Sequence, residues 1–528
     1  MTRDAVVIGA GHNGLVAANL LADAGWDVAV VESSDTPGGS VRSAEIAAPG
    51  YLSDVCSAFY PLGAASPVMR GLGLEAHGLH WRHAPVALAH VLPDDRCVVL
   101  SRDLDTTVAS VDSFAAGDGD AWRRMYTQWQ RLGPALLETV LRPFPPVRGG
   151  IRTARALGVA DLLRGTRYAV MPVRRLGVEL FGGEGGRLLL AGNALHTDLG
   201  PEAMGGAAFG WMLAMLAQDV GFPVPAGGAG QITAALVGRL RTRGVTVQCG
   251  QPTEQIVIRR GRATGVRLAS GEVISARRAV LADVPAPALF LDLVGTAHLP
   301  ARMVADLAAF EWDDSTIKVD WALSGPVPWT AEGARTAGTL HVGVDLDGLT
   351  TFSAALATGQ IPREPFLLVG QMTTADPDRS PAGTESLWAY THVPRGVRWT
   401  PDRLRRHVDR VEAVLERHAP GFSSRIVGRS VLAPGDLERE NPSLVDGAIN
   451  AGTSAPHQQL VFRPVPGLGR SDTPVDGLFL AGSSAHPGGG VHGACGANAA
   501  RAALARNGRA GRVYAAGIRL AHRAIYPD

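Results

Sequence analysis

Lysine is almost absent from this chain of 528 residues. Lys318 is the only one, and arginine supplies every other basic side chain. A codon bias toward arginine accounts for the general shortage but not for the one exception. The 50 basic residues are balanced by 49 acidic ones, which gives a net charge of +1. This balance offers no electrostatic reason to expect nucleic acid as a partner.

Cysteine and long apolar runs are also scarce. The longest apolar run, Ala203 to Leu216, is shorter than the ~18 to 20 residues that span a bilayer. No C-x-x-C pair occurs, so neither a disulfide framework nor a structural metal site is indicated, and a reducing cytoplasm fits. We therefore expect a cytoplasmic protein that at most associates with a membrane surface. The cysteines are Cys56, Cys97, Cys249 and Cys495.

A glycine-rich turn separates an apolar strand from a helix near the N-terminus. The sequence GAGHNG places Gly9, Gly11 and Gly14 in the G-x-G-x-x-G spacing. Glycine permits the tight turn, the close approach of a pyrophosphate and the packing of helix on strand. Glu32 closes the next strand, about 20 residues further on, where a carboxylate accepts hydrogen bonds from a ribose. This βαβ unit therefore predicts a dinucleotide site.

The order of the expected elements indicates an α/β protein in which this Rossmann-like domain is interrupted. Residues 225–283 read as a helix, a strand and a β-meander, and the strand GLFLAG follows near the C-terminus, whereas residues 315–394 alternate like an antiparallel sheet. We predict a dinucleotide-binding domain at 1–110, 225–295 and 465–528, and a substrate-binding domain with a mixed or antiparallel sheet and a helical segment at 111–224 and 296–464.

The helical segment leaves two questions open. From Arg142 to Arg187 it holds nine arginines, which form either a solvated helical face or a patch that contacts anionic lipid headgroups. The apolar run from Ala203 to Leu216 is either a buried core helix or the lining of a substrate tunnel.

A second glycine pair decides which dinucleotide is expected. Gly38 and Gly39 follow Glu32 by six and seven residues, in the stretch SSDTPGGSVRS. This arrangement resembles the signature of the flavoenzyme superfamily that holds the amine oxidases, the phytoene desaturases and the Rab GDP-dissociation inhibitors. Ser40 stands where that signature has arginine, which weakens a direct match to the amine oxidases and is compatible with the phytoene desaturase-like branch, including the pyridine nucleotide-disulfide oxidoreductase domain-containing protein 2 type. The stretches PGYLSDVCSAFYPL, RPVPGLG and GLFLAGSSAHPGGGVHGACGANAA are similar to this branch in the same order.

The resemblance implies FAD as the cofactor and places residues around it. The turn at Gly9 to Gly14, Glu32 and the turn at Gly39 would hold the ADP half. Thr253 would meet adenine through its backbone, and Gly482 and Ser483 would reach the ribityl chain. The complete expected cofactor-binding set is Gly9, Ala10, Gly11, His12, Asn13, Gly14, Glu32, Ser33, Gly39, Ser40, Thr253, Gly482, Ser483, Gly490 and Val491.

The stretch HPGGGVHGACG, which begins at His486, raises the question of what approaches its backbone so closely. It follows a strand and precedes a helix, so we expect a passage free of bulky side chains under the isoalloxazine ring, with the helix N-terminus directed at the pyrimidine end. His486 and His492 lack the spacing and carboxylate partners of a metal site, and no metal is expected.

Two residues are candidates for the chemistry itself. Lys318 lies in a strand that resembles the one whose lysine holds a water against flavin N5 in monoamine and polyamine oxidases; an ordinary surface lysine is the alternative. His492 is either a proton-transfer residue beside the flavin or a packed histidine.

These observations favour an FAD-dependent dehydrogenase or desaturase that removes a hydride from a largely apolar, polyisoprenoid-like substrate to flavin N5. The glycine-rich stretches at Gly182 and Gly227 lack the strand–turn–helix context of a second dinucleotide fold, so oxygen or a quinone is the expected electron acceptor. Two other functions stay open: an amine-oxidase-like oxidase that uses oxygen, and an FAD-scaffold binding protein without turnover.

Overall fold

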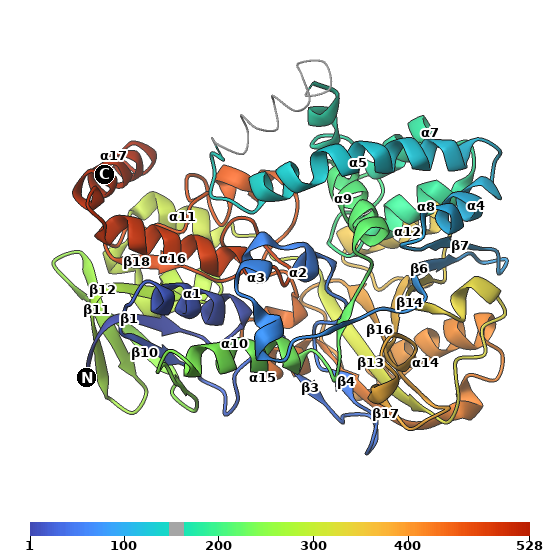
Figure 1. Cartoon of the computed structure of the whole chain (residues 1–528), viewed down its shortest axis with the longest axis horizontal. Coiled ribbons are helices and arrows are strands. Elements are labelled where there is room, and N and C mark those ends of the chain that lie inside the picture. Colours follow the sequence, from blue (N-terminus) through green and yellow to red (C-terminus); the bar gives the residue numbers. More distant parts are fainter. Residues whose placement is uncertain (147–162, 528) are drawn as a thin grey trace.

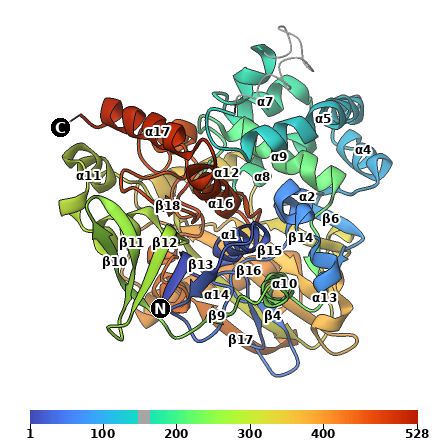
Figure 2. The same cartoon turned by 60° about the vertical axis from the view of Figure 1, so that its left-hand side comes forward.

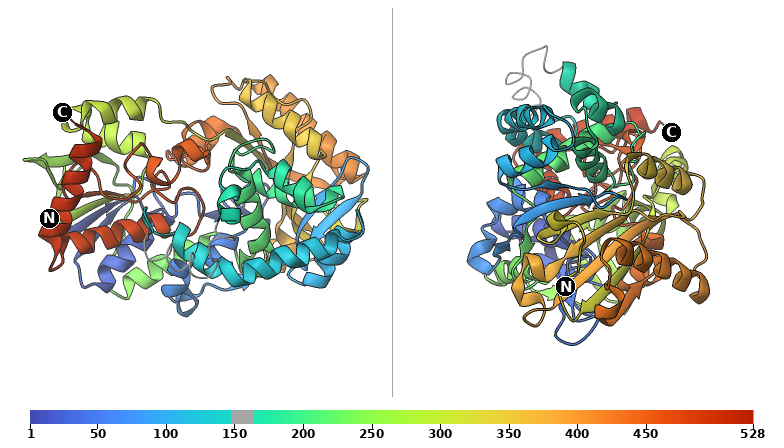
Figure 3. Two further views of the ribbon diagram at one scale, coloured as in Figure 1. Left: turned by 90° about the horizontal axis from the view of Figure 1, so that it is seen from above. Right: turned by 90° about the vertical axis from the view of Figure 1, so that its right-hand side faces the viewer.

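The computed structural model of the chain describes residues 1–146 and 163–527. Two sheets, each of seven strands, organise these residues into two halves that lie side by side along the long axis of the molecule (Figure 1; Figure 3, left). No helix in the described part of the chain is both long and apolar enough to cross a membrane.

The first sheet contains the N-terminal strand and carries the dinucleotide motif. Its order is β10-β11-β12-β1-β2-β9, and β18 also pairs with β12. The strands from β12 to β9, and β18, run in parallel, while β10 and β11 form the antiparallel meander. The strands are β1 (Thr2–Ile8), β2 (Val28–Val31), β9 (Val247–Gln248), β10 (Thr253–Arg259), β11 (Arg262–Leu268), β12 (Val273–Ala282) and β18 (Leu478–Leu480).

Apolar side chains on both faces of this sheet are covered, as parallel strands require. The helices of one face contribute to a single apolar core with alternate residues of β1, β2 and β12. The opposite face packs against a second core that includes α11. Figure 2 shows α1, α10 and α16 around the sheet. The helices are α1 (His12–Asp23), α10 (Gly230–Arg241), α16 (Ala494–Asn507) and α11 (Ala301–Ala308), and α17 (Gly511–Ile525) follows α16.

The second sheet has the order β17-β13-β16-β15-β14-β6-β7. All its pairs are antiparallel except β14 with β6, so the sheet is mixed. Residues 86–100, which the sequence division groups with the dinucleotide domain, pair here through β6 and β7. The strands are β6 (Val86–Val91), β7 (Cys97–Leu100), β13 (Ser315–Leu323), β14 (Ala337–Val342), β15 (Leu367–Gln371), β16 (Glu385–Val393) and β17 (Ile426–Leu432).

Helices cover both faces of the second sheet. One face packs against α14 (Pro401–His418), whose buried valines share a core with β13, β15 and β16. The other face carries a group of helices that we call the roof, drawn in light blue to green in Figure 1 apart from α12, which is gold. The roof consists of α4 (Leu104–Asp112), α5 (Asp118–Val140), α7 (Val173–Leu180), α8 (Glu184–Ala194), α9 (Gly206–Asp219) and α12 (Leu346–Ala357).

Short elements connect the two halves. Two small two-stranded antiparallel sheets and four short helices complete the described fold. They bring distant segments of the chain to the junction of the halves. These elements are β3 (Ser43–Ala44) with β4 (Ser53–Asp54), β5 (Trp81–Arg82) with β8 (Val224–Pro225), α2 (Pro61–Ala65), α3 (Pro67–Gly71), α13 (Met372–Ala375) and α15 (Pro434–Glu440).

Candidate functional site

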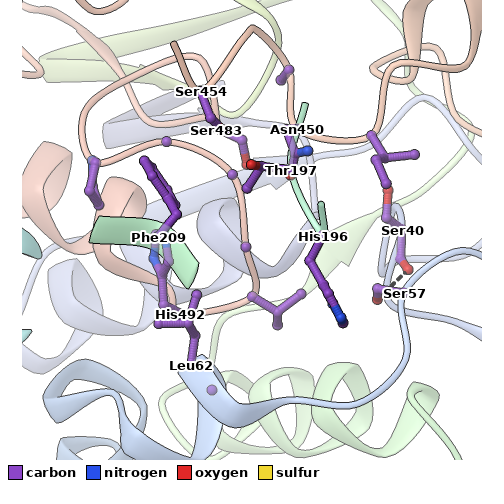
Figure 4. A pocket seen from close by; sticks show the side chains of 18 of the residues that line it. Ser40, Ser57, Leu62, His196, Thr197, Phe209, Asn450, Ser454, Ser483 and His492 are labelled. Atoms are coloured by element: carbon purple, nitrogen blue, oxygen red, sulfur yellow. Dashed lines mark hydrogen bonds between the residues drawn. The ribbon is translucent and has the colours of Figure 1, made fainter. Parts of the chain in front are cut away.

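A cavity of about 830 Å³ joins the two halves. At one end it is lined by the dinucleotide turn and by the glycine passage of the C-terminal segment. At the other it is lined by the second sheet and the roof. Figure 4 shows its centre, with His196, Phe209 and His492 among the side chains that surround it. One continuous space therefore connects the expected cofactor site with an apolar chamber.

The dinucleotide turn is so tightly packed that it requires its glycines. A Cβ at Gly14 would lie 2.2 Å from the carbonyl oxygen of Gly9, and a Cβ at Gly11 would lie 2.7 Å from a carboxylate oxygen of Asp283. Gly9 has a φ of +89°, in the left-handed region that favours glycine. The turn thus presents bare backbone to the cavity at the N-terminus of α1.

Glu32 is held at the end of β2, directly beside this turn. Its carboxylate accepts hydrogen bonds from the backbone N–H of Ala10 at 2.7 Å and of Ser34 at 2.9 Å, and from the Ser33 hydroxyl at 3.2 Å. The side chain lines the cavity although the residue is only 7% exposed. This is the position in which a carboxylate can accept hydrogen bonds from ribose hydroxyls.

Asp283 is a functional candidate that no local sequence motif indicates. It directly follows β12, and its carboxylate accepts a hydrogen bond from the N–H of Gly14 at 2.7 Å. Burial raises the pKa of Asp283 to about 7, against the lowering effect of the Gly14 N–H. Only the strand order could have predicted its place beside the turn, because parallel neighbouring strands end at the same edge of a sheet, and β12 is parallel to β1 and adjacent to it.

The second glycine pair forms a turn that closes over the first. Gly38 and Gly39 have φ values of +125° and +55°, and the Gly38 N–H donates to the carbonyl of Ala10 at 2.9 Å. Ser40, at the arginine position of the signature, accepts a hydrogen bond from Asn441 at 2.8 Å. Arg42 donates to the Gly39 carbonyl at 2.9 Å, so a nearby arginine still braces this turn.

The C-terminal passage is glycine-rich because other backbone and side chains occupy the space around it. A Cβ at Gly489 would lie 2.6 Å from the side-chain oxygen of Asn450, and a Cβ at Gly496 would lie 1.9 Å from the carbonyl of Asn13. Gly488 and Gly490 both have a φ of +113°. His12 bridges the two ends of the chain through a hydrogen bond with the Gly490 carbonyl at 3.2 Å.

Around Gly482 and Ser483 the chain crosses close to the end of β12. A Cβ at Gly482 would lie 2.6 Å from the Val284 carbonyl, and the Ser483 hydroxyl accepts a hydrogen bond from Asn13 at 3.4 Å. The Ser483 carbonyl accepts from the buried guanidinium of Arg463 at 2.8 Å. Gly482, Ser483, Gly490 and Val491 all line the cavity.

His492 also lines the cavity, but one of its nitrogens is already used. Its Nδ1 accepts a hydrogen bond from the N–H of Ala494 at 3.0 Å, at the start of α16. Burial lowers the pKa of His492 to about 3. The ring is therefore neutral with its proton on Nε2, an arrangement that caps the helix and leaves Nε2–H as its hydrogen-bond donor.

Lys318 is buried rather than exposed, with 3% of its surface accessible. It sits opposite Tyr390 in the β13–β16 pairing, so its side chain projects from the sheet face that carries the cavity. Its ammonium donates to both carboxylate oxygens of Asp320 at 2.5 Å and lies 6.0 Å from the ring of Trp388. Trp388 and Tyr390 line the cavity, and Lys318 itself does not. A catalytic role for Lys318 stays a prediction.

Thr253 begins β10 and is not among the described residues that line the cavity. The preceding segment lies beside Glu32, because the Gln251 N–H donates to the Glu32 carbonyl at 2.8 Å. Ala10 and Asn13 support the turns from behind, with no accessible surface of their own.

The arrangement fits FAD on its own geometry. The two glycine turns and the glycine passage line one end of the cavity with backbone that bears no Cβ, and Glu32 is placed at the ribose position. The ADP half would be held by Gly9, Gly11, Glu32 and Gly39, and the flavin end by Gly482, Ser483, Gly490 and Val491. In the described part of the chain, no group of three or more His, Cys, Asp or Glu side chains could hold a metal ion.

Comparisons with known proteins indicate the same cofactor. Residues 4–192 match the profile of the family described as FAD dependent oxidoreductase (DAO). The chain is 28% identical to pyridine nucleotide-disulfide oxidoreductase domain-containing protein 2 of Mus musculus, over 94% of this chain and 92% of the mouse protein. It is 24% identical to the neurosporene-forming phytoene desaturase of Cereibacter sphaeroides, over 95% of this chain and 94% of that protein.

Solved structures add a likeness in fold. Cyclohexylamine oxidase from Brevibacterium oxydans superposes with a TM-score of 0.60, covering 96% of this chain and 99% of that one. The sequence identity is 18%, so this comparison establishes the fold alone.

Proposed function

Taking the chain as an FAD-dependent oxidoreductase, we propose that it dehydrogenates a largely apolar organic substrate of the polyisoprenoid class. The reaction would remove a hydride from one substrate carbon and a proton from its neighbour, leaving a double bond. Bound FAD supplies the two-electron acceptor for such chemistry. The chain's own residues orient the substrate and exclude water.

The cavity carries this proposal. Its chamber beyond the cofactor end is lined chiefly by apolar side chains from the roof, and no lysine or arginine among the described residues lines the cavity. An apolar substrate would gain the hydrophobic free energy of burial there, whereas a charged group would lose its hydration without a partner. The apolar lining from the roof comprises Leu132, Leu136, Leu137, Val140, Phe209, Trp211, Met212 and Leu213.

The apolar run from Ala203 to Leu216, expected from the sequence to be either a core helix or the lining of a substrate tunnel, contributes both to the core and to the cavity wall. Most of α9 is buried in the roof core, as a core helix would be. Ala208, Phe209 and Met212 also line the cavity. We propose that α9 is the wall against which the substrate chain packs.

Oxygen or a quinone is the electron acceptor that we propose. The two further glycine-rich stretches pack against side chains instead of opening a second dinucleotide turn. A Cβ at Gly186 would lie 2.6 Å from the Phe181 ring, and a Cβ at Gly228 would lie 2.3 Å from the Ser43 hydroxyl. A small diffusible acceptor needs no second nucleotide domain.

Peripheral contact with a membrane is a further part of the proposal, and it rests on exposed apolar residues in segments that line the cavity. Leu460 lines the cavity yet is 48% exposed; Phe462, two positions further on, is 45% exposed, and Val170, which follows the cavity-lining Ala169, is 60% exposed. Several arginines of the helical segment are paired, as Arg167 and Arg175 are with Glu179. The lipid contact would therefore be mainly apolar; Arg148, Arg152 and Arg155 lie outside the described residues.

An amine-oxidase-like oxidase is the second candidate, because Lys318 projects from the cavity-facing side of the second sheet. The bidentate contact with Asp320 argues for a structural role of this lysine. Binding to FAD without turnover is the third candidate.

One experiment separates the three functions. The FAD-loaded protein is mixed anaerobically with acyclic polyisoprenoids, long-chain alcohols and aliphatic amines while the visible flavin absorbance is followed. We expect bleaching by polyisoprenoid compounds. Bleaching by amines alone, with peroxide released in air, would establish the oxidase instead. No bleaching by any class would overturn the dehydrogenase proposal.

A further inference from the structure

Polar groups without partners gather on one wall of the otherwise apolar chamber. Thr339 lines the cavity, is 2% exposed, and its hydroxyl has no hydrogen-bond partner. Tyr390 and His196 line the same cavity, and the hydrogen bonds within the described ranges engage neither the Tyr390 hydroxyl nor the Nδ1 of His196. Buried polar groups in proteins are nearly always satisfied, so the unpartnered Thr339 hydroxyl, with two further polar groups beside it on the cavity wall, calls for a ligand.

Strand register places Thr339 and Tyr390 on one face of the second sheet. Thr339 pairs with Gly370 and His341 with Leu368, while Leu368 pairs in turn with Tyr390. Directly paired residues share a face, so all of them project toward the roof. Gly370 is needed there because a Cβ would lie 2.3 Å from the indole of Trp388.

His196 approaches this wall from the roof, just beyond the end of α8. Its Nε2 lies 2.9 Å from the Nε2 of His341, and its ring contacts Phe222 with centroids 5.8 Å apart. A Cβ at Gly192 would lie 2.2 Å from the Nδ1 of His341, so the helix leaves this position bare for the ring. His341 thereby fixes the orientation of His196 at the cavity surface.

The pair of histidines is uncharged. Burial lowers the pKa of His196 to about 3 and lowers that of His341 well below its usual range. A single proton then lies between the two Nε2 atoms. If His341 donates it, the Nδ1 of His196 carries a hydrogen; if His196 donates it, Nδ1 is an acceptor. The pair can therefore match either a donor or an acceptor on a ligand.

We infer that His196, Thr339 and Tyr390 form a recess that binds a neutral oxygen function, a hydroxyl or a carbonyl, on the otherwise apolar substrate. A carboxylate would find no cation there, since Lys318 is already neutralised by Asp320 and no other lysine or arginine of the described ranges lines the cavity. An ammonium would find no anion in the recess. This inference rests on the proposed function, because it names the substrate class for the same cavity.

The test uses two probes that differ only in this group. The FAD-loaded protein is titrated anaerobically with geranylgeraniol and with the corresponding hydrocarbon, and the dissociation constants are read from the flavin spectrum or from tryptophan fluorescence. We expect the alcohol to bind roughly tenfold more tightly, as two or three hydrogen bonds in a dry site allow. Geranylgeranic acid and geranylgeranylamine should bind more weakly than the alcohol.

Variants assign the preference to the recess. T339V and Y390F delete only hydroxyls, and the two together should reduce the preference to less than about threefold while the hydrocarbon affinity is unchanged. Thr391 offers a matched control: its buried hydroxyl also lacks a partner, it is adjacent to Tyr390, and it is not among the residues that line the cavity. T391V should keep the full preference.

The outcomes separate the recess from the proposed function. Equal binding of alcohol and hydrocarbon, with flavin bleaching by either, would overturn the recess and leave the dehydrogenase proposal standing. A preference for the acid or the amine, or a change in hydrocarbon affinity in T339V and Y390F, would also overturn it, because ordered water or packing would then explain the free hydroxyls. Failure of every probe to bind would overturn both.

Discussion

The two ends of the cavity present their functional groups in different ways. At the first sheet, the groups that face the cavity are largely bare backbone, and glycines at fixed positions create the space for them. At the second sheet, side chains from separate strands and a roof helix meet across long sequence distances. Backbone recognition leaves a short, readable signature in the sequence, whereas a site assembled from side chains leaves none.

The largest effect is expected from a substitution in the dinucleotide turn, at the end of the cavity that is lined by backbone. In G14A the new Cβ would lie 2.2 Å from the Gly9 carbonyl, which is backbone and cannot move aside. We expect less than about a tenth of the wild-type FAD content in the purified protein, a shift of at least ~1.4 kcal/mol. The control is G71A, since a Cβ there has no neighbour within 4 Å. Full flavin content in G14A would show that this turn does not hold the cofactor.

The next effect tests Lys318. In K318M the Asp320 carboxylate is left buried without its partner, which costs roughly 3–5 kcal/mol of unfolding free energy. The double variant K318M/D320N should regain most of that loss in denaturant titrations. If the stable double variant reduces oxygen as fast as wild type, Lys318 is structural. A large, selective loss in oxygen reduction would support the predicted catalytic role.

At the side-chain end, G370A should disturb the substrate and spare the cofactor. Its Cβ would lie 2.3 Å from the Trp388 indole, so the ring must shift into the cavity that it lines. We expect kcat/KM to fall roughly ten- to a hundredfold, since small misplacements near a substrate carry such costs. G435A is the matched control, with no neighbour within 4 Å. Loss of FAD from G370A would show that the second sheet also contributes to cofactor binding, contrary to this prediction.

The smallest effect concerns Asp283 and depends on pH. Burial raises its pKa to about 7, so the folded protein keeps the proton that the unfolded chain has lost above its ordinary pKa of 3.8. Stability therefore falls as pH rises toward 7, with a slope of at most about 1.4 kcal/mol per unit. The carboxylate formed above pH 7 lies beside the turn that would hold a pyrophosphate.

Affinity for FAD should accordingly decline by about tenfold between pH 6 and pH 8 in the wild-type protein. In D283N, which cannot ionise, fluorescence titration should give a nearly constant affinity across this range. An equal decline in both proteins would assign the pH dependence to another group.

The contrast between the ends also explains what could be predicted from the sequence. The α/β fold, the dinucleotide turn and the place of Glu32 follow from local patterns, because each lies within one βαβ unit. Asp283 escaped notice since its role depends on β12 pairing beside β1, far along the chain. Thr339 and His196 could not be found at all, because only the folded sheet and roof bring them to one cavity.

The burial of Lys318 could not be predicted from the sequence either. Its neighbour Asp320 lies two positions away in the sequence, but alternation in a strand does not reveal that both side chains are sealed beneath Trp388. A single lysine in an alternating strand is equally consistent with an exposed surface residue and with a functional one. The structure adds the buried carboxylate of Asp320 as the partner of this lysine.

If one continuous cavity carries the substrate from the roof to the flavin end, a bulky side chain placed within that cavity should stop the reaction. Ala208 lines the cavity from α9, far in the sequence from every glycine of the cofactor turns. The A208W protein and the wild type, matched for FAD content, are titrated anaerobically with an acyclic polyisoprenoid while the visible flavin spectrum is recorded. We predict bleaching of the wild-type flavin and none in A208W, with the same FAD content in both. Identical bleaching in the two proteins would contradict the account.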